Sequence, residues 1–152
     1  MVIDFLDGNL FESDSQTLVN PINCHGIIER GIALKFKKKY PLMFEDYVKR
    51  CYEGGVQVGK PYLFREKDLQ IVNFPIKIHW QDPPKLDYIN EGLHYLTNHY
   101  KEWGITSLAM PALGCGLGGL DWNAVSILYV DILGTLDIPV SIYLPVVGYK
   151  GV

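Results

Sequence analysis

The sequence predicts an α/β fold in which a mixed central sheet is sandwiched between helices. Short apolar and β-branched segments alternate along the chain with longer segments whose apolar residues recur at helical spacing. Two glycine-containing loops each stand between an expected strand and an expected helix, and no internal repeat interrupts the alternation. With 152 residues and no recognisable linker, the chain is expected to form a single domain spanning 1–152.

Local signals justify the individual elements. The first strand ends at Asp7-Gly8, a turn pair, and three polar residues at 66–68 join two further strands as a hairpin. The helix at 42–52 follows Pro41 and stops at Gly54-Gly55. Strands are expected at 2–6, 17–19, 61–65, 69–74, 105–110 and 140–144, and helices at 32–39, 42–52, 85–103 and 121–133.

Pro21 is expected to end the second strand. It follows the apolar segment 17–19 and Asn20 directly. Because proline has no N–H to donate to a strand ladder, it rarely continues a central strand. The chain is therefore predicted to turn at this proline.

The composition is that of an ordinary folded chain, with 48% hydrophobic and 20% charged residues. A net charge of −3 supplies no basic field for duplex nucleic acid, so any such contact is expected to be local. No apolar run approaches membrane-spanning length, and the acidic N-terminus does not fit a signal peptide. Cys24, Cys51 and Cys115 are odd in number and lack CxxC spacing, which favours a reduced, cytoplasmic compartment. No membrane partner is expected, because no apolar run is long enough to span a membrane.

The segment 110–122, MPALGCGLGGLDW, predicts an anion site. Gly114, Gly116, Gly118 and Gly119 stand between an expected strand and a helix that begins near Asp121. Glycines let backbone N–H groups approach a ligand oxygen, and a helix N-terminus offers unpaired N–H groups with a positive dipole end. The alternative is a tight strand-to-helix turn, but four glycines in six residues favour phosphate or diphosphate binding.

A second loop, NCHGIIERG at 23–31, has the same place between a strand and a helix. In α/β proteins ligands bind outside the carboxyl ends of the strands, so the two loops are expected to face one ligand. A diphosphate flanked by sugars fits such a pair, with the amides of Asn20 and Asn23 on ribose hydroxyls. For either asparagine alone, a role in capping the local turn is equally consistent with the sequence.

Other sites are less consistent with the sequence. The glycine loop lacks the Gly-Lys-Ser/Thr ending of a triphosphate-binding loop, and the chain contains no GxSxG elbow. Cys115 sits between glycines near a helix N-terminus, which would lower the pKa of a thiol nucleophile, although a small residue filling the loop is the favoured interpretation. His94 and His99 are five residues apart, off the spacing that puts two imidazoles on one helix face. No metal and no cofactor are expected.

Lys77 is the candidate catalytic residue. It lies between Pro75 and Trp80, where a buried strand is expected to emerge, with apolar neighbours on either side. A partly desolvated lysine near a phosphate or sugar can act as an electrophilic clamp, a proton donor or, with a lowered pKa, a nucleophile. His25, His79 and Trp80 are expected to gate the same pocket. The alternative is a solvated lysine on an edge strand.

These segments together resemble the macrodomain family, whose members recognise ADP-ribose. The resemblance rests on DGNLF, LVNPINCHGIIERGIALKF, NFPIKIHW and MPALGCGLGGLDW, which occur in the family's order over almost the whole chain. More narrowly, the segments are similar to the DarG-like subgroup and to glycohydrolases that act on carboxylate esters. The DarG-like resemblance implies removal of ADP-ribose from thymine in single-stranded DNA, opposing a DarT-type toxin.

The resemblance also implies roles for particular residues. Lys77 matches the catalytic lysine of the subgroup, and Asn9 stands where many members have an aspartate that holds the adenine amino group. Gly118 occupies the position of an aspartate that assists the lysine in the carboxylate-ester enzymes, which favours the DarG-like route. The residues implied to bind ADP-ribose are Asn9, Leu10, Asn20, Asn23, Gly31, Ile32, Ala33, Gly114, Cys115, Gly116, Leu117 and Gly118.

Three functions stay open from the sequence. The leading one is an ADP-ribosyl hydrolase for single-stranded DNA, and the second is the same chemistry on ADP-ribosylated glutamate or aspartate in proteins. The third is a non-catalytic ADP-ribose reader, because a fold does not determine a function. A cluster at Lys35, Lys37, Lys38 and Lys39 would offer DNA a local basic strip, although a solvated helix face explains it equally well.

Overall fold

The six strands form one mixed sheet in the order β1-β6-β5-β2-β4-β3. The structure is a computed structural model that describes residues 2–145, with Val2 described by its backbone alone. Every neighbouring pair is parallel except β3 and β4, the expected hairpin. The predicted mixed sheet is confirmed. The strands are β1 (Val2–Leu6), β2 (Thr17–Asn23), β3 (Tyr62–Glu66), β4 (Leu69–Lys77), β5 (Leu108–Met110) and β6 (Pro139–Tyr143).

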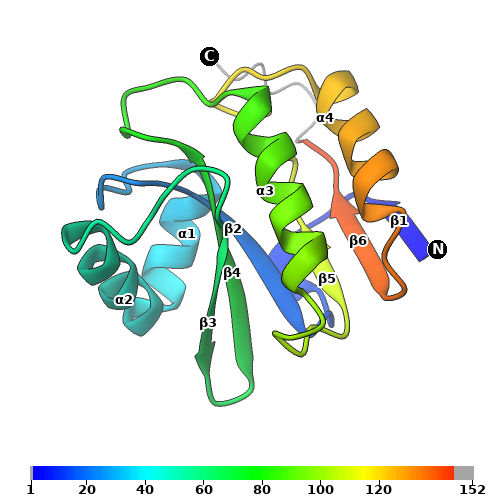
Figure 1. Cartoon of the computed structure of the whole chain (residues 1–152), viewed down its shortest axis with the longest axis horizontal. Helices are drawn as coiled ribbons and strands as arrows, with labels where there is room; N and C mark the ends of the chain where they lie inside the picture. Colours follow the sequence, from blue (N-terminus) through cyan, green and yellow to red (C-terminus); the bar gives the residue numbers. More distant parts are fainter. Residues whose placement is uncertain (1, 146–152) are drawn as a thin grey trace.

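Helices cover both faces of the sheet (Figure 1). Helices α1 (Gly31–Lys39) and α2 (Pro41–Tyr52) pack on one face, and α3 (Leu86–His99) and α4 (Trp122–Leu128) pack on the other. A 3₁₀ turn, η1 (Leu10–Glu12), follows β1, and a π-helical turn, η2 (Tyr129–Leu133), follows α4. The predicted helix-sheet-helix sandwich is therefore confirmed.

Successive residues of the central strands belong alternately to two hydrophobic cores, one on each face of the sheet. Leu18 and Ile71 belong to the cluster under α1 and α2, whereas Val19 and Val72 belong to the cluster under α3 and α4. This division follows from the two-residue period of a strand. Both faces of β2 and β4 are therefore buried, as is usual for a parallel sheet covered by helices.

The predicted end of β2 at Pro21 is wrong, because the strand continues to Asn23. Strand β5 pairs with β2 only at Thr17 and Leu18, so β2 has no partner on that side by the time it reaches Pro21. A proline can be accommodated where the ladder has ended, because no N–H is needed there. The divergence of β2 from β5 also opens the sheet edge where the cleft described below begins.

Strand β4 likewise runs past its predicted end at Phe74, to Lys77. Its antiparallel partner β3 stops pairing at Asn73, which leaves Pro75 without a ladder partner on that side. The longer β2 and β4 continue to pair with each other, with an irregularity after Ile22 that sets Asn23 opposite Lys77. Pro21 and Pro75 thus lie where β2 no longer pairs with β5 and β4 no longer pairs with β3. Each proline is two residues before a polar residue of the cleft, Asn23 or Lys77.

Two helix boundaries also differ from the prediction. Helix α3 stops at His99 instead of 103, and the chain reverses at Gly104, whose φ of 68° favours glycine. The expected helix 121–133 is α-helical only to Leu128 and then widens into η2. Such π-helical turns frequently lie at functional sites, and η2 begins with the buried Tyr129.

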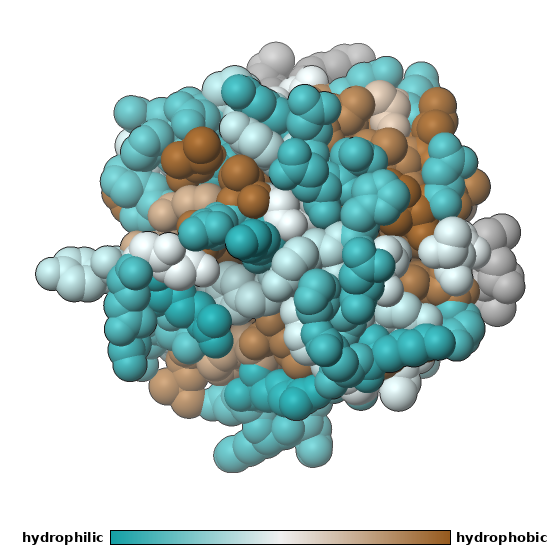
Figure 2. All heavy atoms as spheres, viewed as in Figure 1, coloured by the Kyte–Doolittle hydropathy of each residue, from teal (hydrophilic) through white to brown (hydrophobic). Residues whose placement is uncertain are grey.

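The face of the molecule seen in Figure 2 is mostly hydrophilic, and apolar side chains gather on it over the region of α4. Ile127 of α4 and Val130 of η2 are 61% and 43% exposed. Within residues 2–145, no helix is long and apolar enough to cross a membrane.

Candidate functional site

A cleft of about 1070 Å³ lies at the carboxyl ends of the central parallel strands. This is the edge of an α/β sheet at which ligands usually bind. Both predicted loops contribute to it, together with η1 and the segment after β4. Its lining comprises Gly8, Asn9, Leu10, Phe11, Pro21, Ile22, Asn23, Ile27–Lys35, Lys38, Ile76, Lys77, Trp80–Pro84, Pro111, Ala112, Gly114, Gly116–Gly118 and Tyr143–Pro145.

The open helix N-terminus at the cleft belongs to α1. No side chain caps the first turn of α1, and Gly31, Ile32 and Ala33 all line the cleft. Arg30 precedes the helix and is exposed at the same place. Uncapped N–H groups beside a guanidinium favour an anion. The helix after the glycine loop differs, because Asp121 caps α4 by accepting from the N–H of Asn123 at 3.2 Å and no residue of α4 lines the cleft.

The glycine loop is tightly folded on itself. Gly114 has a φ of 74°, and a Cβ added at Gly118 would lie 2.6 Å from the carbonyl oxygen of Gly114 and 2.7 Å from Cγ of Pro84. A Cβ added at Gly31 would lie 3.8 Å from Cδ1 of Leu117, so the loop meets the start of α1. The packing of the loop therefore requires glycine at position 118. The aspartate that the carboxylate-ester enzymes have at this position would not fit here without movement of the loop.

Tyr129 holds the base of this loop from inside the core. Its hydroxyl donates to the carbonyl of Pro111 at 2.6 Å and accepts from the N–H of Leu113 at 2.9 Å. Its side chain is fully buried, and burial raises the pKa of the phenol well above its ordinary value. Tyr129 therefore stays protonated and connects η2 to the backbone that leads into the glycines.

We expect Tyr129→Phe to destabilise the protein by about 1–3 kcal/mol, because it leaves a buried N–H and a buried carbonyl unpaired. Chemical denaturation measures this loss. Tyr143→Phe is the control, since within residues 2–145 the hydroxyl of Tyr143 makes no side-chain hydrogen bond, unlike that of Tyr129. An unchanged free energy of unfolding in Tyr129→Phe would contradict the anchoring role.

Lys77 is the last residue of β4 and its side chain is half-buried in the cleft wall. Its Nζ donates to the carbonyl oxygen of Trp80 at 2.9 Å. Burial lowers the pKa of Lys77, the charge of Arg30 lowers it further, and Asp82 acts in the opposite direction. The structure therefore supplies a lysine with a more acidic ammonium group beside the carboxyl ends of two central strands.

His25 and His79 lie together on the rim next to this lysine. Their ring centroids are 4.9 Å apart in an edge-to-face arrangement, and both side chains are exposed. The N–H of Cys24 donates to the carbonyl of Ile78 at 2.9 Å and ties the two rim segments together. Neither histidine lines the cleft, whereas Trp80 does.

A family model described as the Macro domain matches residues 19–128. The chain belongs to the macrodomain family. It is 41% identical over 156 residues to a Mycobacterium tuberculosis protein named DNA ADP-ribosyl glycohydrolase, covering 99% of this chain and 44% of that protein. The chain thus spans less than half the length of this curated relative.

Two solved structures have the same fold as this macrodomain. The macrodomain of Mycobacterium tuberculosis DarG is 42% identical with a TM-score of 0.91, covering 95% of this chain and 99% of that one. Thermosipho africanus DarTG in complex with ADP-ribose is 36% identical with a TM-score of 0.92, covering 95% of this chain and 42% of that one. The predicted family and its DarG-like subgroup are confirmed.

The three predicted asparagines occupy different places in the macrodomain. Asn9 lines the cleft, and its Oδ1 caps η1 by accepting from the N–H of Phe11 at 3.0 Å. Asn23 also lines the cleft, but its amide shapes the loop through Tyr47, His25 and Ile27.

Asn20 does not line the cleft. Its side chain is buried in the sheet, where Nδ2 donates to Oδ1 of Asn73 at 2.9 Å. Asn73 in turn donates to the hydroxyl of Tyr62 at 3.2 Å. The register of β2 and β4 places Asn20 directly opposite Asn73, so the two amides form a cross-strand pair inside the protein.

The side chain of Cys115 points into the core and is absent from the cleft lining. Its Sγ donates to the carbonyl of Leu113 at 3.5 Å. Burial raises the pKa of the thiol to about 12, so a thiolate nucleophile is excluded at neutral pH. Cys115 is a small residue that fills the loop, while Gly114, Gly116, Leu117 and Gly118 face the cleft.

The lysines of α1 divide into two pairs. Lys35 and Lys38 line the cleft. Lys37 instead donates to the carbonyl of Ile28 at 3.3 Å, and the Nζ of Lys39 lies 5.6 Å from the centroid of the Phe11 ring. Positions 35, 38 and 39 are neighbours on the helix surface and Lys37 lies on the opposite side, so the contact of Lys39 with Phe11, and not the helical period alone, keeps Lys39 out of the cleft lining.

Several lining residues were missed by sequence reasoning. Arg30 lies in the loop 23–31, and a cation directly before an expected helix start is a usable signal for it. Asp82 and Pro84 lie in the segment between β4 and α3, where the sequence indicates no site residue beyond His79 and Trp80. Tyr143 to Pro145 reach the cleft solely because β6 lies next to β5.

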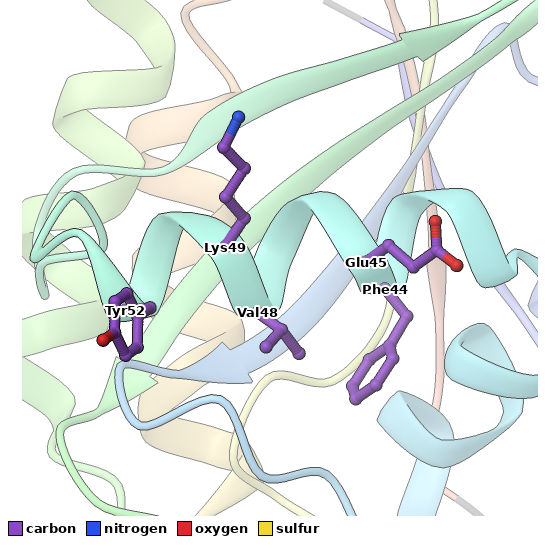
Figure 3. A pocket seen from close by; sticks show the side chains of 5 residues that line it. All are labelled: Phe44, Glu45, Val48, Lys49 and Tyr52. Atoms are coloured by element: carbon purple, nitrogen blue, oxygen red, sulfur yellow. The ribbon is translucent and has the colours of Figure 1, made fainter.

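A second, shallow pocket of about 500 Å³ lies on the outer side of α2 (Figure 3). It is lined by Phe44, Glu45, Val48, Lys49 and Tyr52, and none of the predicted site residues is among them. In the described part of the chain, no three His, Cys, Asp or Glu residues gather in a way that could hold a metal ion. The predicted site residues that line a pocket therefore all line the large cleft.

Proposed function

We propose that this macrodomain binds ADP-ribose in the large cleft and removes it from a nucleobase of single-stranded DNA. The observation that carries this proposal is Lys77 in the wall of a cleft that is also lined by the uncapped start of α1 and by the glycine loop. The likeness to a DNA ADP-ribosyl glycohydrolase and to a structure in complex with ADP-ribose supports the substrate class.

In the proposed binding mode, the diphosphate lies between the two loops. The N–H groups of Ile32 and Ala33 and the guanidinium of Arg30 would face it from one side, and the backbone of Gly116 to Gly118 from the other. The adenosine end would lie toward Asn9 and Leu10, and the distal ribose toward Asn23 and Lys77. The register that sets Asn23 opposite Lys77 supports this direction.

In the proposed mechanism, the Lys77 ammonium acts as the general acid. As the bond between C1″ of the distal ribose and the base nitrogen breaks, Nζ gives a proton to that nitrogen. Water forms the new bond to C1″, and its surplus proton returns to the neutral amine. A burial-lowered pKa makes the ammonium a better proton donor. The tightly held diphosphate keeps C1″ beside the amine, which lowers the barrier through positioning.

The rim beside Lys77 is where the modified base would lie. His25 and His79 are exposed there and Trp80 lines the adjacent wall, so aromatic faces are available for stacking on a base. Lys35 and Lys38 add local positive charge on the far side of the cleft in an otherwise acidic chain. We further propose that the base is thymine and that a DarT-type toxin produces the substrate, which would place the reaction in the cytoplasm.

Release of free ADP-ribose from a single-stranded oligonucleotide carrying one ADP-ribosylated thymine tests the proposal. An ADP-ribosylated glutamate peptide is assayed in parallel. We expect turnover of the oligonucleotide alone. Turnover of the peptide alone would overturn the DNA substrate, and tight ADP-ribose binding by calorimetry without any turnover would leave the protein a reader.

We expect the rate to fall on the alkaline side at a pH below the ordinary pKa of lysine. Burial lowers the pKa of Lys77, and the ammonium fraction declines as pH rises through that lowered value. A single-turnover pH profile with the modified oligonucleotide measures this decline, with protein fluorescence at each pH as a control for unfolding. A rate that instead rises over the same range would assign the reaction to the neutral amine.

A further inference from the structure

Asp82 closes the turn that carries the hydrogen-bond acceptor of Lys77. The N–H of His79 donates to Oδ2 of Asp82 at 3.1 Å, and the N–H of Asp82 donates to the carbonyl of His79 at 3.1 Å. The side chain and backbone of one residue thus bracket the four-residue turn from His79 to Asp82. Trp80, whose carbonyl accepts from Lys77 Nζ at 2.9 Å, is inside this turn.

The turn has few other supports. Gln81, Asp82 and Pro83 are exposed, and the next regular element begins only at Leu86. A carbonyl that holds a catalytic amine must itself be held, because a displacement of about 1 Å can cost about 100-fold in rate. The carboxylate of Asp82 is the side chain that the structure provides for this purpose, since it fixes the first residue of the turn to the last.

We propose that Asp82 is a positioning residue that holds the Trp80 carbonyl, and through it the Lys77 amine, in place for the reaction. This inference rests on the proposed role of Lys77. Asp82 acts by accepting a hydrogen bond from the backbone, so an uncharged acceptor of the same shape should replace it. It also lines the cleft, where its charge faces Lys77 and opposes that of Arg30.

The decisive experiment compares Asp82→Ala with Asp82→Asn in the single-turnover oligonucleotide assay. We expect Asp82→Ala to lower the rate about 10- to 100-fold, since only the backbone bond from residue 82 to His79 then closes the turn and the Trp80 carbonyl is held less firmly. Asp82→Asn keeps an oxygen acceptor for the His79 N–H, and we expect it to retain most of the rate below neutral pH. Without the opposing charge of Asp82, the pKa of Lys77 is lowered further, so the alkaline decline of Asp82→Asn should begin at a lower pH.

Asp87→Ala is the matched control, because Asp87 is an exposed carboxylate in the first turn of α3 and lies outside the cleft lining. Arg30 and Asp82 are the charged groups that act on the amine, so the control should leave the pH profile unchanged. A wild-type rate in Asp82→Ala, or an equal loss in the alanine and asparagine variants, would overturn the positioning role. Full activity in Lys77→Ala would instead overturn the proposed mechanism. Failure of the Asp82 proposal can therefore be distinguished from failure of the proposed function.

Discussion

Lys77→Ala is expected to lower the rate of ADP-ribose release from the modified oligonucleotide by about 100- to 10,000-fold. This is the usual contribution of a general acid that donates a proton in the transition state. The side chain is half-buried and lies at the end of β4, so its loss leaves the sheet intact. Affinity for free ADP-ribose, measured by calorimetry, should change far less than the rate, because the proposed diphosphate contacts lie in the two loops.

Two variants make this prediction specific. Lys60→Ala removes an exposed lysine outside the cleft lining and should leave the rate unchanged. Lys77→Arg keeps a cation but raises its pKa beyond the range of a proton donor at neutral pH, so it should remain nearly as inactive as the alanine variant. Equal rates in wild type and Lys77→Ala would remove the lysine from the mechanism.

Gly118→Ala is expected to weaken ADP-ribose binding by at least about tenfold. A Cβ at this position would lie 2.6 Å from the Gly114 carbonyl oxygen and 2.7 Å from Cγ of Pro84, so the loop backbone must move. Overpacking of this kind costs about 1–3 kcal/mol, and a loss of about 1.4 kcal/mol in binding corresponds to tenfold. Isothermal titration with ADP-ribose measures the loss of affinity. Thermal unfolding of the same variant measures how much the substitution lowers the stability of the domain.

Gly55→Ala is the matched control. A Cβ there would lie 3.5 Å from the carbonyl oxygen of Arg50, an ordinary contact, and Gly55 is far from the cleft lining. We also expect Gly118→Asp to gain no activity on ADP-ribosylated glutamate, since the larger side chain meets the same two obstacles. An unchanged dissociation constant in Gly118→Ala would show that the loop yields without affecting the ligand.

Much of the site could be predicted from local sequence. The two glycine loops and the lysine after NFPI are recognisable because backbone freedom, helix starts and an isolated cation in an apolar segment are properties of neighbouring residues. The cleft does bring both loops and Lys77 together. The roles proposed for them in ADP-ribose binding remain predictions for the experiments above.

The directions in which the site side chains point could not be predicted from the sequence. Asn20 and Cys115 stand beside residues that line the cleft, yet the side chain of Asn20 is buried against Asn73 and that of Cys115 is partly buried against the core. In a strand, adjacent residues face opposite ways, and in a tight loop the direction depends on the backbone conformation, so the pattern of residue types does not reveal which side chains face the ligand. The same applies to Asp82, whose hydrogen bond to His79 depends on the shape of a turn.

Residue period and composition within short segments are enough to predict the α/β alternation, the glycine-rich loop after β5 and a lysine at the end of a buried strand. The three-dimensional structure is needed to show that β2 and β4 continue through Pro21 and Pro75, since only the pairing of their outer neighbours shows where an N–H is not needed. It also decided that α1, and not α4, offers the open N-terminus, because a cap is a contact between particular atoms. The extended ends of β2 and β4 set Asn23 opposite Lys77, and both residues line the cleft together with the start of α1.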